Sequence, residues 1–326
     1  MEILDFTEMR PNERGEHCNS GSIAFGVSLY SKVEVTFIEN EVIVVRGSGD
    51  RLVVEHFARV MKLLTGYRGG FEFMVEANPY VHQGLGGTAS LASAVVISIN
   101  AGLGSPFGDR DLVKIAAWNY VESGPDGKLY PGQSTGASGW IACKGGFSIV
   151  SSDAELAFRH VLPEGYTVMV GVPQTGSPGG SAVGKGVAES YVEIPLLEKL
   201  HFYDRFNSAK TCHWTLMRLI PAVIQGDLRR VGDLVWDMMV TNPKGLATVL
   251  AHQSCTAIDC LCDIRNCGAE VSFVSAVGPA IVTLTSPNYT DSVRKHLTRH
   301  GYSFLALDLV DRGGIATLNG GSGLKL

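Results

Sequence analysis

A glycine-rich segment at residues 80–96, YVHQGLGGTASLASAVV, constrains the fold of this 326-residue chain more than any other feature. Glycines let the backbone curl, and the small apolar segment that follows them is typical of a helix. The alternating segment GGFEFMVEANP, at 69–79, predicts a strand directly before the loop. Because the N-terminal end of a helix is positively polarised, this order of strand, glycine loop and helix predicts a site for a phosphorylated ligand. The structural alternative is a tight turn that packs the helix, expected at 88–102, against a sheet.

The composition indicates a globular enzyme with either two lobes or one large domain. Hydrophobic residues make up 45% of the chain, and 39 residues are glycine. A formal net charge of -5 and the lack of a recognisable motif do not favour a nucleic-acid binder. The N-terminal segment lacks the pattern of a secretory signal, and no apolar run is long enough to span a membrane, so we expect a cytoplasmic protein with no membrane segment.

Hydrophobic periodicity predicts further elements along the whole chain. Strands are expected within 22–45 and at 145–152, 166–173, 270–278, 280–286 and 302–310, and helices at 50–65, 109–122, 244–267 and 289–301. We expect the strands within 22–45 to be neighbours, and Pro221 to divide or kink two helices within 186–239. Strands and helices alternate without a regular βαβ period, which predicts an α+β fold of two lobes, residues 1–165 and 166–326.

The glycine loop resembles the phosphate loop of the GHMP small-molecule kinases, whose pattern is Pro, three residues and then Gly-Leu-Gly-Ser-Ser-Ala. Here Pro79 lies one residue further upstream, Gly87 replaces the first serine, and Thr88 takes the place of the second. GSIAFGVSL and SAVGPAIVTLT resemble an early strand and the late glycine turn of the same superfamily. The resemblance implies a two-lobe GHMP kinase-like fold. Its candidate phosphate cradle consists of Gly84, Gly86, Gly87, Thr88 and Ser90.

One catalytic group of the kinases is missing from this sequence. The kinases have an aspartate in a Gly-x-Asp setting before a Gly-Gly strand, where it acts on the hydroxyl that is phosphorylated. The matching stretch STGASGWIACKGGF has Ala137 and Ser138 at that place. Phosphoryl transfer depends on positioning the nucleophile, so the loop alone is weak evidence for a kinase. An ATP-dependent small-molecule kinase stays open as an alternative, as does a non-catalytic relative that only binds a phosphate ester.

A second resemblance fits the sequence better. STGASGWIACKGGFSIVSS and LMRLIPAVIQGDLRRVGDLV are similar to segments of β-ribofuranosylaminobenzene 5'-phosphate synthase, and VDRGGIA resembles its Asn-Arg-Gly-Ala ending, with Asp311 in place of Asn. The resemblance implies a C-glycoside synthase that joins ribose 5-phosphate from phosphoribosyl pyrophosphate to a ring carbon, with loss of pyrophosphate and carbon dioxide. It also implies Mg2+ on the pyrophosphate and a homodimer.

The acceptor of the ribose stays open in the sequence. The opening Arg-Leu-His of the synthase family is not visible, and the chain reads EHCNSGSIAFG there instead. The pattern is also similar to the C-nucleoside synthases of formycin-type and pyrazofurin-type antibiotics, which couple a pyrazole dicarboxylate. The two candidate acceptors are therefore a 4-hydroxybenzoate and a pyrazole dicarboxylate.

Other polar residues are candidates for the site, each with a structural alternative. A second phosphate holder, for the sugar 5'-phosphate, is expected at Ser134, Thr135, Gly136 and Ala137, which otherwise form a polar loop. Candidates for ribose, phosphate or carboxylate contacts are Asn19, Ser20, Lys185, Arg205 and Lys210. Candidates for acid, base or metal-binding roles are His82, Glu189 and His213. Turn residues, solvated cations and a salt-bridged Lys185–Glu189 pair are the alternatives, and no metal ligands are identifiable.

Overall fold

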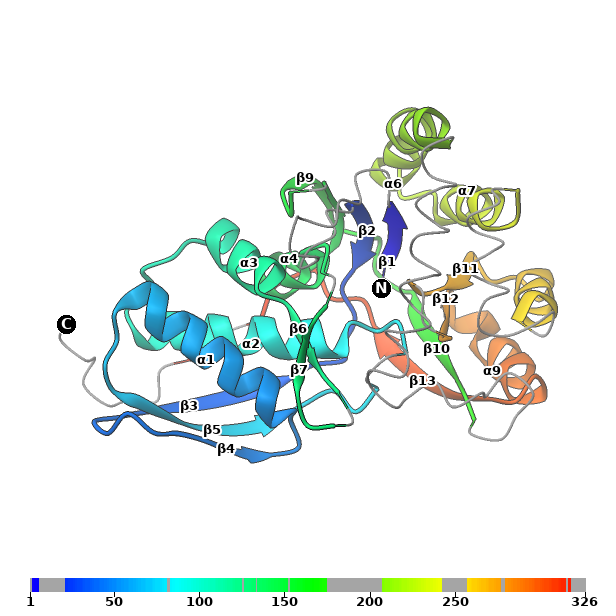
Figure 1. Cartoon of the computed structure of the whole chain (residues 1–326). Coiled ribbons are helices and arrows are strands. Elements are labelled where there is room, and N and C mark those ends of the chain that lie inside the picture. Colours follow the sequence, from blue (N-terminus) through cyan, green and yellow to red (C-terminus); the bar gives the residue numbers. More distant parts are fainter. Residues whose placement is uncertain are drawn as a thin grey trace.

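A computed structural model describes residues 2–5, 21–80, 83–124, 126–132, 134–151, 153–174, 207–241, 257–276, 279–314 and 316–317. In these residues the chain forms two four-stranded sheets, one three-stranded sheet and one two-stranded sheet, with helices packed against them. Figure 1 shows a small middle sheet between an N-terminal and a C-terminal assembly of helices and strands. The mixed architecture confirms the α+β class. The boundary at 165/166 stays a prediction.

The N-terminal sheet has the order β3-β5-β4. Its strands are β3 (Lys32–Ile38), β4 (Ile43–Gly47) and β5 (Gly70–Glu76). The expectation that the strands within 22–45 are neighbours is wrong here, because β5 lies between β3 and β4. The connection from β4 to β5 runs through a helix, which makes the two strands parallel, and β3 then pairs antiparallel on the other side of β5.

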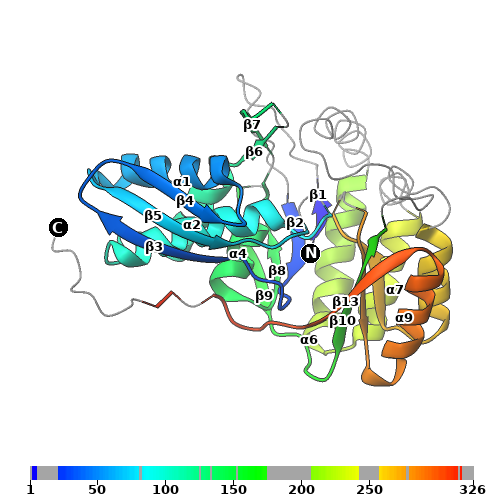
Figure 2. The ribbon, with the colours of Figure 1, turned by 90° about the horizontal axis from the view of Figure 1, so that it is seen from below.

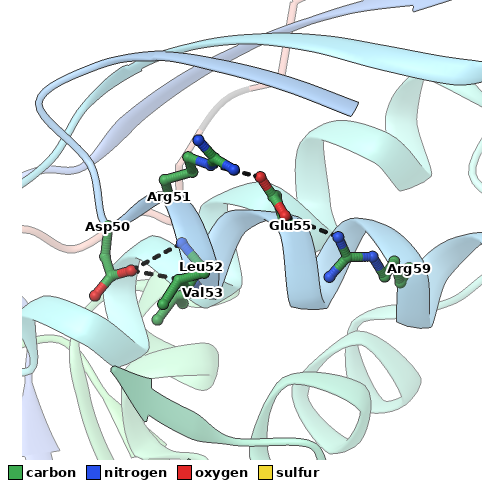
Figure 3. A network of polar contacts seen from close by, with 6 residues as sticks. All are labelled: Asp50, Arg51, Leu52, Val53, Glu55 and Arg59. Carbon is green, nitrogen blue, oxygen red and sulfur yellow. Dashed lines mark hydrogen bonds and ion pairs between the residues drawn. The ribbon is translucent and has the colours of Figure 1, made fainter. Parts of the chain in front are cut away.

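Helix α1 (Arg51–Thr65) connects β4 to β5, as the sequence predicts. The Asp50 carboxylate accepts hydrogen bonds from the backbone N–H groups of Leu52 at 3.0 Å and Val53 at 3.2 Å, and so caps the first turn. Burial alone would raise the pKa of Glu55, but hydrogen bonds from Arg51 and Arg59 lower it (Figure 3). The helix ends at the left-handed Gly66.

Helix α2 (Gly87–Gly102) begins directly after the glycine loop and matches the predicted helix. It lies beside α1 on one face of the N-terminal sheet (Figures 1 and 2). Buried side chains of α1, α2 and β5 form one continuous core, which includes Phe57, Phe71 and Val95. This apolar layer fixes where the start of α2, and with it the glycine loop, lies against the sheet.

The middle sheet has the order β1-β2-β8-β9. Its strands are β1 (Glu2–Asp5), β2 (Gly21–Phe25), β8 (Phe147–Val150) and β9 (Leu156–His160). Strand β2, which the sequence analysis grouped with the strands of the N-terminal sheet, therefore belongs to a different sheet. Helix α4 (Ala137–Lys144) begins within the stretch expected to be a polar loop, and it packs against β2 and β8.

Helix α3 (Asp109–Trp118) ends earlier than predicted, because the chain turns into a β-hairpin. Strands β6 (Val121–Ser123) and β7 (Leu129–Pro131) pair antiparallel across a turn that contains Gly124 and Gly127. The Gly124 N–H donates to the Lys128 carbonyl at 2.7 Å and closes this turn. Val121 and Glu122, predicted to be helical, are therefore strand residues.

The C-terminal sheet has the order β11-β12-β10-β13, with all neighbouring strands antiparallel. Its strands are β10 (Thr167–Pro173), β11 (Val271–Val274), β12 (Ile281–Thr285) and β13 (Tyr302–Asp308). The short 3-10 turn Pro287–Tyr289 leads into α9 (Thr290–Arg299), which packs against β10 and β13. These strands and α9 lie where the sequence predicts them, and 257–266 is helical within the predicted 244–267.

Pro221 does not divide two helices, while the kink expected as the other possibility stays a prediction. Residues 207–214 are helical, and the chain continues through a π-helical turn, Thr215–Leu219, into α6 (Ile220–Ile224). Proline removes an N–H from the helical ladder, and the π turn just before it gives the backbone room to continue. The break comes afterwards, at the left-handed Gly226, before α7 (Leu228–Thr241), which packs against β11.

The segment after β13 crosses from the C-terminal sheet to the middle sheet (Figure 2). The Gly26 N–H donates to the Gly146 carbonyl at 3.0 Å, and the Gly146 N–H donates to the Val310 carbonyl at 2.7 Å. The Arg159 guanidinium donates to the carbonyls of Gly145 at 3.1 Å and Asp311 at 2.6 Å. The VDRGGIA segment thus ties the two parts of the molecule together, with Asp311 contributing its backbone carbonyl.

Within the described ranges, no helix is both long and apolar enough to span a bilayer.

Candidate functional site

The glycine loop leads from β5 into the first turn of α2. Gly84 and Gly86 have positive φ angles of 76° and 67°, a conformation that costs other residues conformational free energy. Gly86 is the N-cap of α2 and supplies no side-chain cap, while its carbonyl accepts the Ser90 N–H at 2.8 Å. The first N–H groups of α2 therefore lack a capping side chain, which suits them to an anion.

The C-terminal sheet holds the glycine loop in place. The Ser275 hydroxyl, which follows β11, donates to the Gly84 carbonyl at 2.7 Å. The Ala280 N–H, just before β12, donates to the Gln83 carbonyl at 3.3 Å. The turn between two strands of one assembly thus fixes a loop that belongs to the other. The sequence analysis predicted both segments but not this contact.

Gln83 also has a buried side-chain oxygen, Oε1, that makes no hydrogen bond to the residues that the structure describes. An unpaired buried acceptor costs about 1–3 kcal/mol relative to its hydrated state. A ligand, a water molecule or a cation beside the loop would offset that cost. Gln83 is therefore a polar group next to the predicted phosphate cradle that still has the capacity to bind.

The second predicted loop is a network of hydroxyl caps at the start of α4. The Thr135 hydroxyl accepts the Ala137 N–H at 3.2 Å and the Ser22 hydroxyl of β2 at 2.9 Å. The Ser134 hydroxyl accepts the Gly136 N–H at 3.3 Å, and Gly136 is the left-handed N-cap of α4. Ala137 is fully buried in the core between α3, α4 and the middle sheet. The hydroxyls of Ser134 and Thr135 thus shape this loop from within.

The two loops meet at Ser138. A Cβ atom built on Gly86 would lie 2.8 Å from the Ser138 Oγ, so the start of α4 lies directly beside the start of α2. Helices α2 and α4 also pack against each other. From the sequence, Ser138 is indicated only as one of the two residues that replace the kinase aspartate. The start of the segment is predicted to be a loop because it contains many Gly, Ser and Thr residues.

The remaining predicted site residues lie elsewhere. Lys210 and His213 are on the helical stretch 207–214, where both are exposed and neither makes a hydrogen bond or ion pair in the described part of the chain. Six candidates lie outside the described residues: Asn19, Ser20, His82, Lys185, Glu189 and Arg205. In the ranges that the structure describes, no group of three His, Cys, Asp or Glu side chains is arranged to hold a metal ion.

Comparison with known proteins supports the architecture. Residues 51–126, which run from α1 through the glycine loop and α2 to β6, match the GHMP kinases N terminal domain. A beta-ribofuranosylphenol 5'-phosphate synthase of Methanothermobacter thermautotrophicus is 23% identical over 246 residues, covering 72% of this chain and 69% of that protein.

Solved structures of enzymes with several different activities share the fold. Mevalonate pyrophosphate decarboxylase from Streptococcus pyogenes has a TM-score of 0.66 at 11% identity, covering 97% of this chain and 96% of its own. Lactococcus lactis galactokinase has a TM-score of 0.65 at 12% identity, covering 95% and 92%. Homoserine kinase from Cytophaga hutchinsonii has a TM-score of 0.62 at 16% identity, covering 90% of each chain. The chain therefore has the α+β fold of the GHMP kinases, with the N-terminal domain of that group at residues 51–126.

Proposed function

We propose that this protein is a C-glycoside synthase that transfers ribose 5-phosphate from phosphoribosyl pyrophosphate to a ring carbon of an aromatic or heteroaromatic carboxylate. Pyrophosphate and carbon dioxide are the other products. The observation that carries the proposal is the start of α4, where Ser138 lies beside the glycine loop. By the resemblance to the kinases, Ala137 and Ser138 take the place of the catalytic aspartate. The site keeps the anion-binding helix ends of the fold but has a neutral hydroxyl where a kinase has its base.

The proposed reaction suits a site without a base at this point. The bond between the anomeric carbon and pyrophosphate breaks, and its electron pair leaves with the pyrophosphate. The ring carbon that bears the carboxylate then bonds to the anomeric carbon. The electron pair of its bond to the carboxylate returns to the ring as carbon dioxide departs. No ring proton has to be removed, so catalysis rests on orienting the two substrates and stabilising the leaving group.

The residues at the two helix ends have roles that follow from their geometry. The first-turn N–H groups of α2, at Gly87 and Thr88, would donate to the phosphate oxygens as negative charge develops on them. In the loop at Ser134–Ala137, residues 135–137 are buried, so the half-buried Ser134 would contact the sugar 5'-phosphate close to the start of α4. The 23%-identical relative supports this assignment, because its name describes ribose 5'-phosphate joined to a phenol.

Mg2+ is the expected cofactor, and it would neutralise the charge of the pyrophosphate when bound. Mg2+ usually keeps several waters and is bound through phosphate oxygens and few protein ligands. Gln83, with its unpaired buried Oε1, is a described residue that fits such an oxygen ligand. The acceptor is a 4-hydroxybenzoate or a pyrazole dicarboxylate, and the resemblance to the synthases also supports a homodimer.

An ATP-dependent small-molecule kinase is the second candidate, because galactokinase and homoserine kinase share the fold. Thermal unfolding with Mg2+ plus either phosphoribosyl pyrophosphate or ATP separates the two candidates, since a ligand that binds the folded state raises the melting temperature. The proposal expects an increase with phosphoribosyl pyrophosphate and none with ATP. An increase with ATP alone would favour the kinase, and an increase with phosphoribosyl pyrophosphate but no turnover of any carboxylate would favour a non-catalytic binder.

A further inference from the structure

The described helices differ in how negative side chains complement their N-terminal ends. Asp50 caps α1, Asp109 and Asp111 lie in the first turn of α3, and Asp291 lies in the first turn of α9. Helices α2 and α4 have no acidic residue in the first turn and no side-chain bond from their N-cap glycines. Their positively polarised ends are therefore left without a compensating carboxylate.

The N-terminal ends of α2 and α4 also lie next to each other. The Ser138 Oγ lies 2.8 Å from the position of a Cβ atom on Gly86, and Ser138 is the second residue of α4. Gly86, with no side chain, leaves that space open between the hydroxyl and the loop. Ser138 is half-buried, and no hydrogen bond of its hydroxyl occurs in the described part of the chain. A hydroxyl donor thus faces the glycine loop without a partner among the described residues.

Gln83 adds an independent sign that this place binds a ligand. Its side-chain Oε1, at the start of the glycine loop, is buried and has no hydrogen bond in the described ranges. The Gln83 acceptor on the glycine loop and the Ser138 hydroxyl beside that loop are thus two polar groups that the described residues leave without hydrogen bonds.

We propose that Ser138 is a further ligand-contacting residue, whose hydroxyl donates to the second of two linked phosphate groups when the first is bound at the start of α2. The inference rests on the proposed function, since it names the part of the site that holds the pyrophosphate. Ser138 then favours a diphosphate over a single phosphate, because its hydroxyl adds a hydrogen bond that only the second linked phosphate group receives. A carboxylate at this position would repel the same group.

Inorganic pyrophosphate and inorganic phosphate, each with Mg2+, are the probes that test this role by titration calorimetry. We expect Ser138→Ala to weaken pyrophosphate binding by about tenfold or more, as for the loss of a hydrogen bond to a charged group, and phosphate binding much less. Ser138→Asp should abolish pyrophosphate binding. The matched control is Ser98→Ala, which removes an α2 hydroxyl that donates to the Val33 carbonyl at 3.3 Å, far from the loop, and should bind pyrophosphate like the wild type.

The results separate this inference from the proposed function. Equal pyrophosphate affinity in Ser138→Ala and the wild type, or no pyrophosphate binding by the wild type, overturns the role of Ser138. An equal weakening for phosphate and pyrophosphate overturns the selection of a diphosphate. If Ser138→Ala selectively weakens pyrophosphate binding while the wild type forms no glycoside from phosphoribosyl pyrophosphate, the role of Ser138 stands and the proposed function fails. Melting curves of each variant show whether it is folded.

Discussion

Gly86 shows how a single residue shapes the candidate site. Its φ of 67° lies in the left-handed region, and its missing side chain leaves the space beside the Ser138 Oγ open. Any other residue here would meet two separate costs: backbone strain in the left-handed conformation, and contact with the start of α4. The first cost affects stability, and the second affects the space for a ligand.

A pair of glycine variants separates these costs. Gly66 has a similar φ of 71° at the end of α1, but a Cβ atom there would meet nothing within 4 Å. Gly66→Ala and Gly86→Ala should each lose about 1–2 kcal/mol of unfolding free energy. Only Gly86→Ala should also weaken the binding of phosphoribosyl pyrophosphate. Denaturant unfolding and calorimetry measure the two effects, and full-strength binding by Gly86→Ala would remove the loop from the site.

Helices α1 and α2 were predictable from the sequence because their signals are local. Asp50, the apolar spacing and Gly66 define α1 within one segment. Helix α4 was not predictable in the same way, since its Gly-rich and Ser-rich sequence is typical of a loop and its buried contacts come from β2, β8 and α3. The strand order β3-β5-β4 and the contact between Ser138 and the glycine loop depend on segments far apart in sequence, which periodicity does not report.

The hydrogen bond from Ser275, after β11, to the glycine loop predicts an effect on ligand binding. Ser275→Ala removes the hydroxyl that donates to the Gly84 carbonyl, and we expect weaker phosphoribosyl pyrophosphate binding because the loop is less well held. Ser272→Ala, within β11, is the matched control, since its buried hydroxyl makes no hydrogen bond to any described residue and its removal should be close to neutral. Equal affinity in the two variants, measured by calorimetry, would show that this contact does not position the loop.

The ion pairs between α3 and Glu155, just before β9, predict how the stability of the fold depends on pH. Hydrogen bonds from Arg110 and Lys114 lower the pKa of Glu155 to about 2 from the ordinary value of 4.5. Because the folded-state pKa is the lower one, Glu155 stabilises the fold above about pH 4.5, and this contribution is lost as the pH falls toward about 2. Glu155→Gln should therefore be less stable than the wild type near pH 7, and the difference should shrink in acid.

Urea unfolding of both proteins across this pH range measures the difference. The ion pairs lie near the surface and are screened by salt, so raising the ionic strength should reduce the difference as well. A stability difference that stays constant from neutral to acidic pH would mean that Glu155 acts through packing and not through its charge.

At the scale of the whole molecule, the candidate site depends on residues from both halves of the chain. The glycine loop and α4 come from the N-terminal half, while Ser275 and Ala280 hold the loop from the C-terminal sheet. The fold is shared with kinases and with a decarboxylase, so the architecture alone does not assign the reaction. The chemistry at the start of α4 carries the assignment, since a hydroxyl there is compatible with a reaction that removes no ring proton.

The central claim is that a carbon–carbon bond forms between ribose 5-phosphate and the acceptor ring. Mass spectrometry of the products from phosphoribosyl pyrophosphate, Mg2+ and a carboxyl-labelled acceptor, either 4-hydroxybenzoate or a pyrazole dicarboxylate, tests it directly. We predict a ribosyl 5'-phosphate product that lacks the labelled carboxyl group, with equal amounts of pyrophosphate and labelled carbon dioxide. A product that retains the label, or the formation of ADP and a phosphorylated acceptor when ATP is supplied instead, would contradict the account.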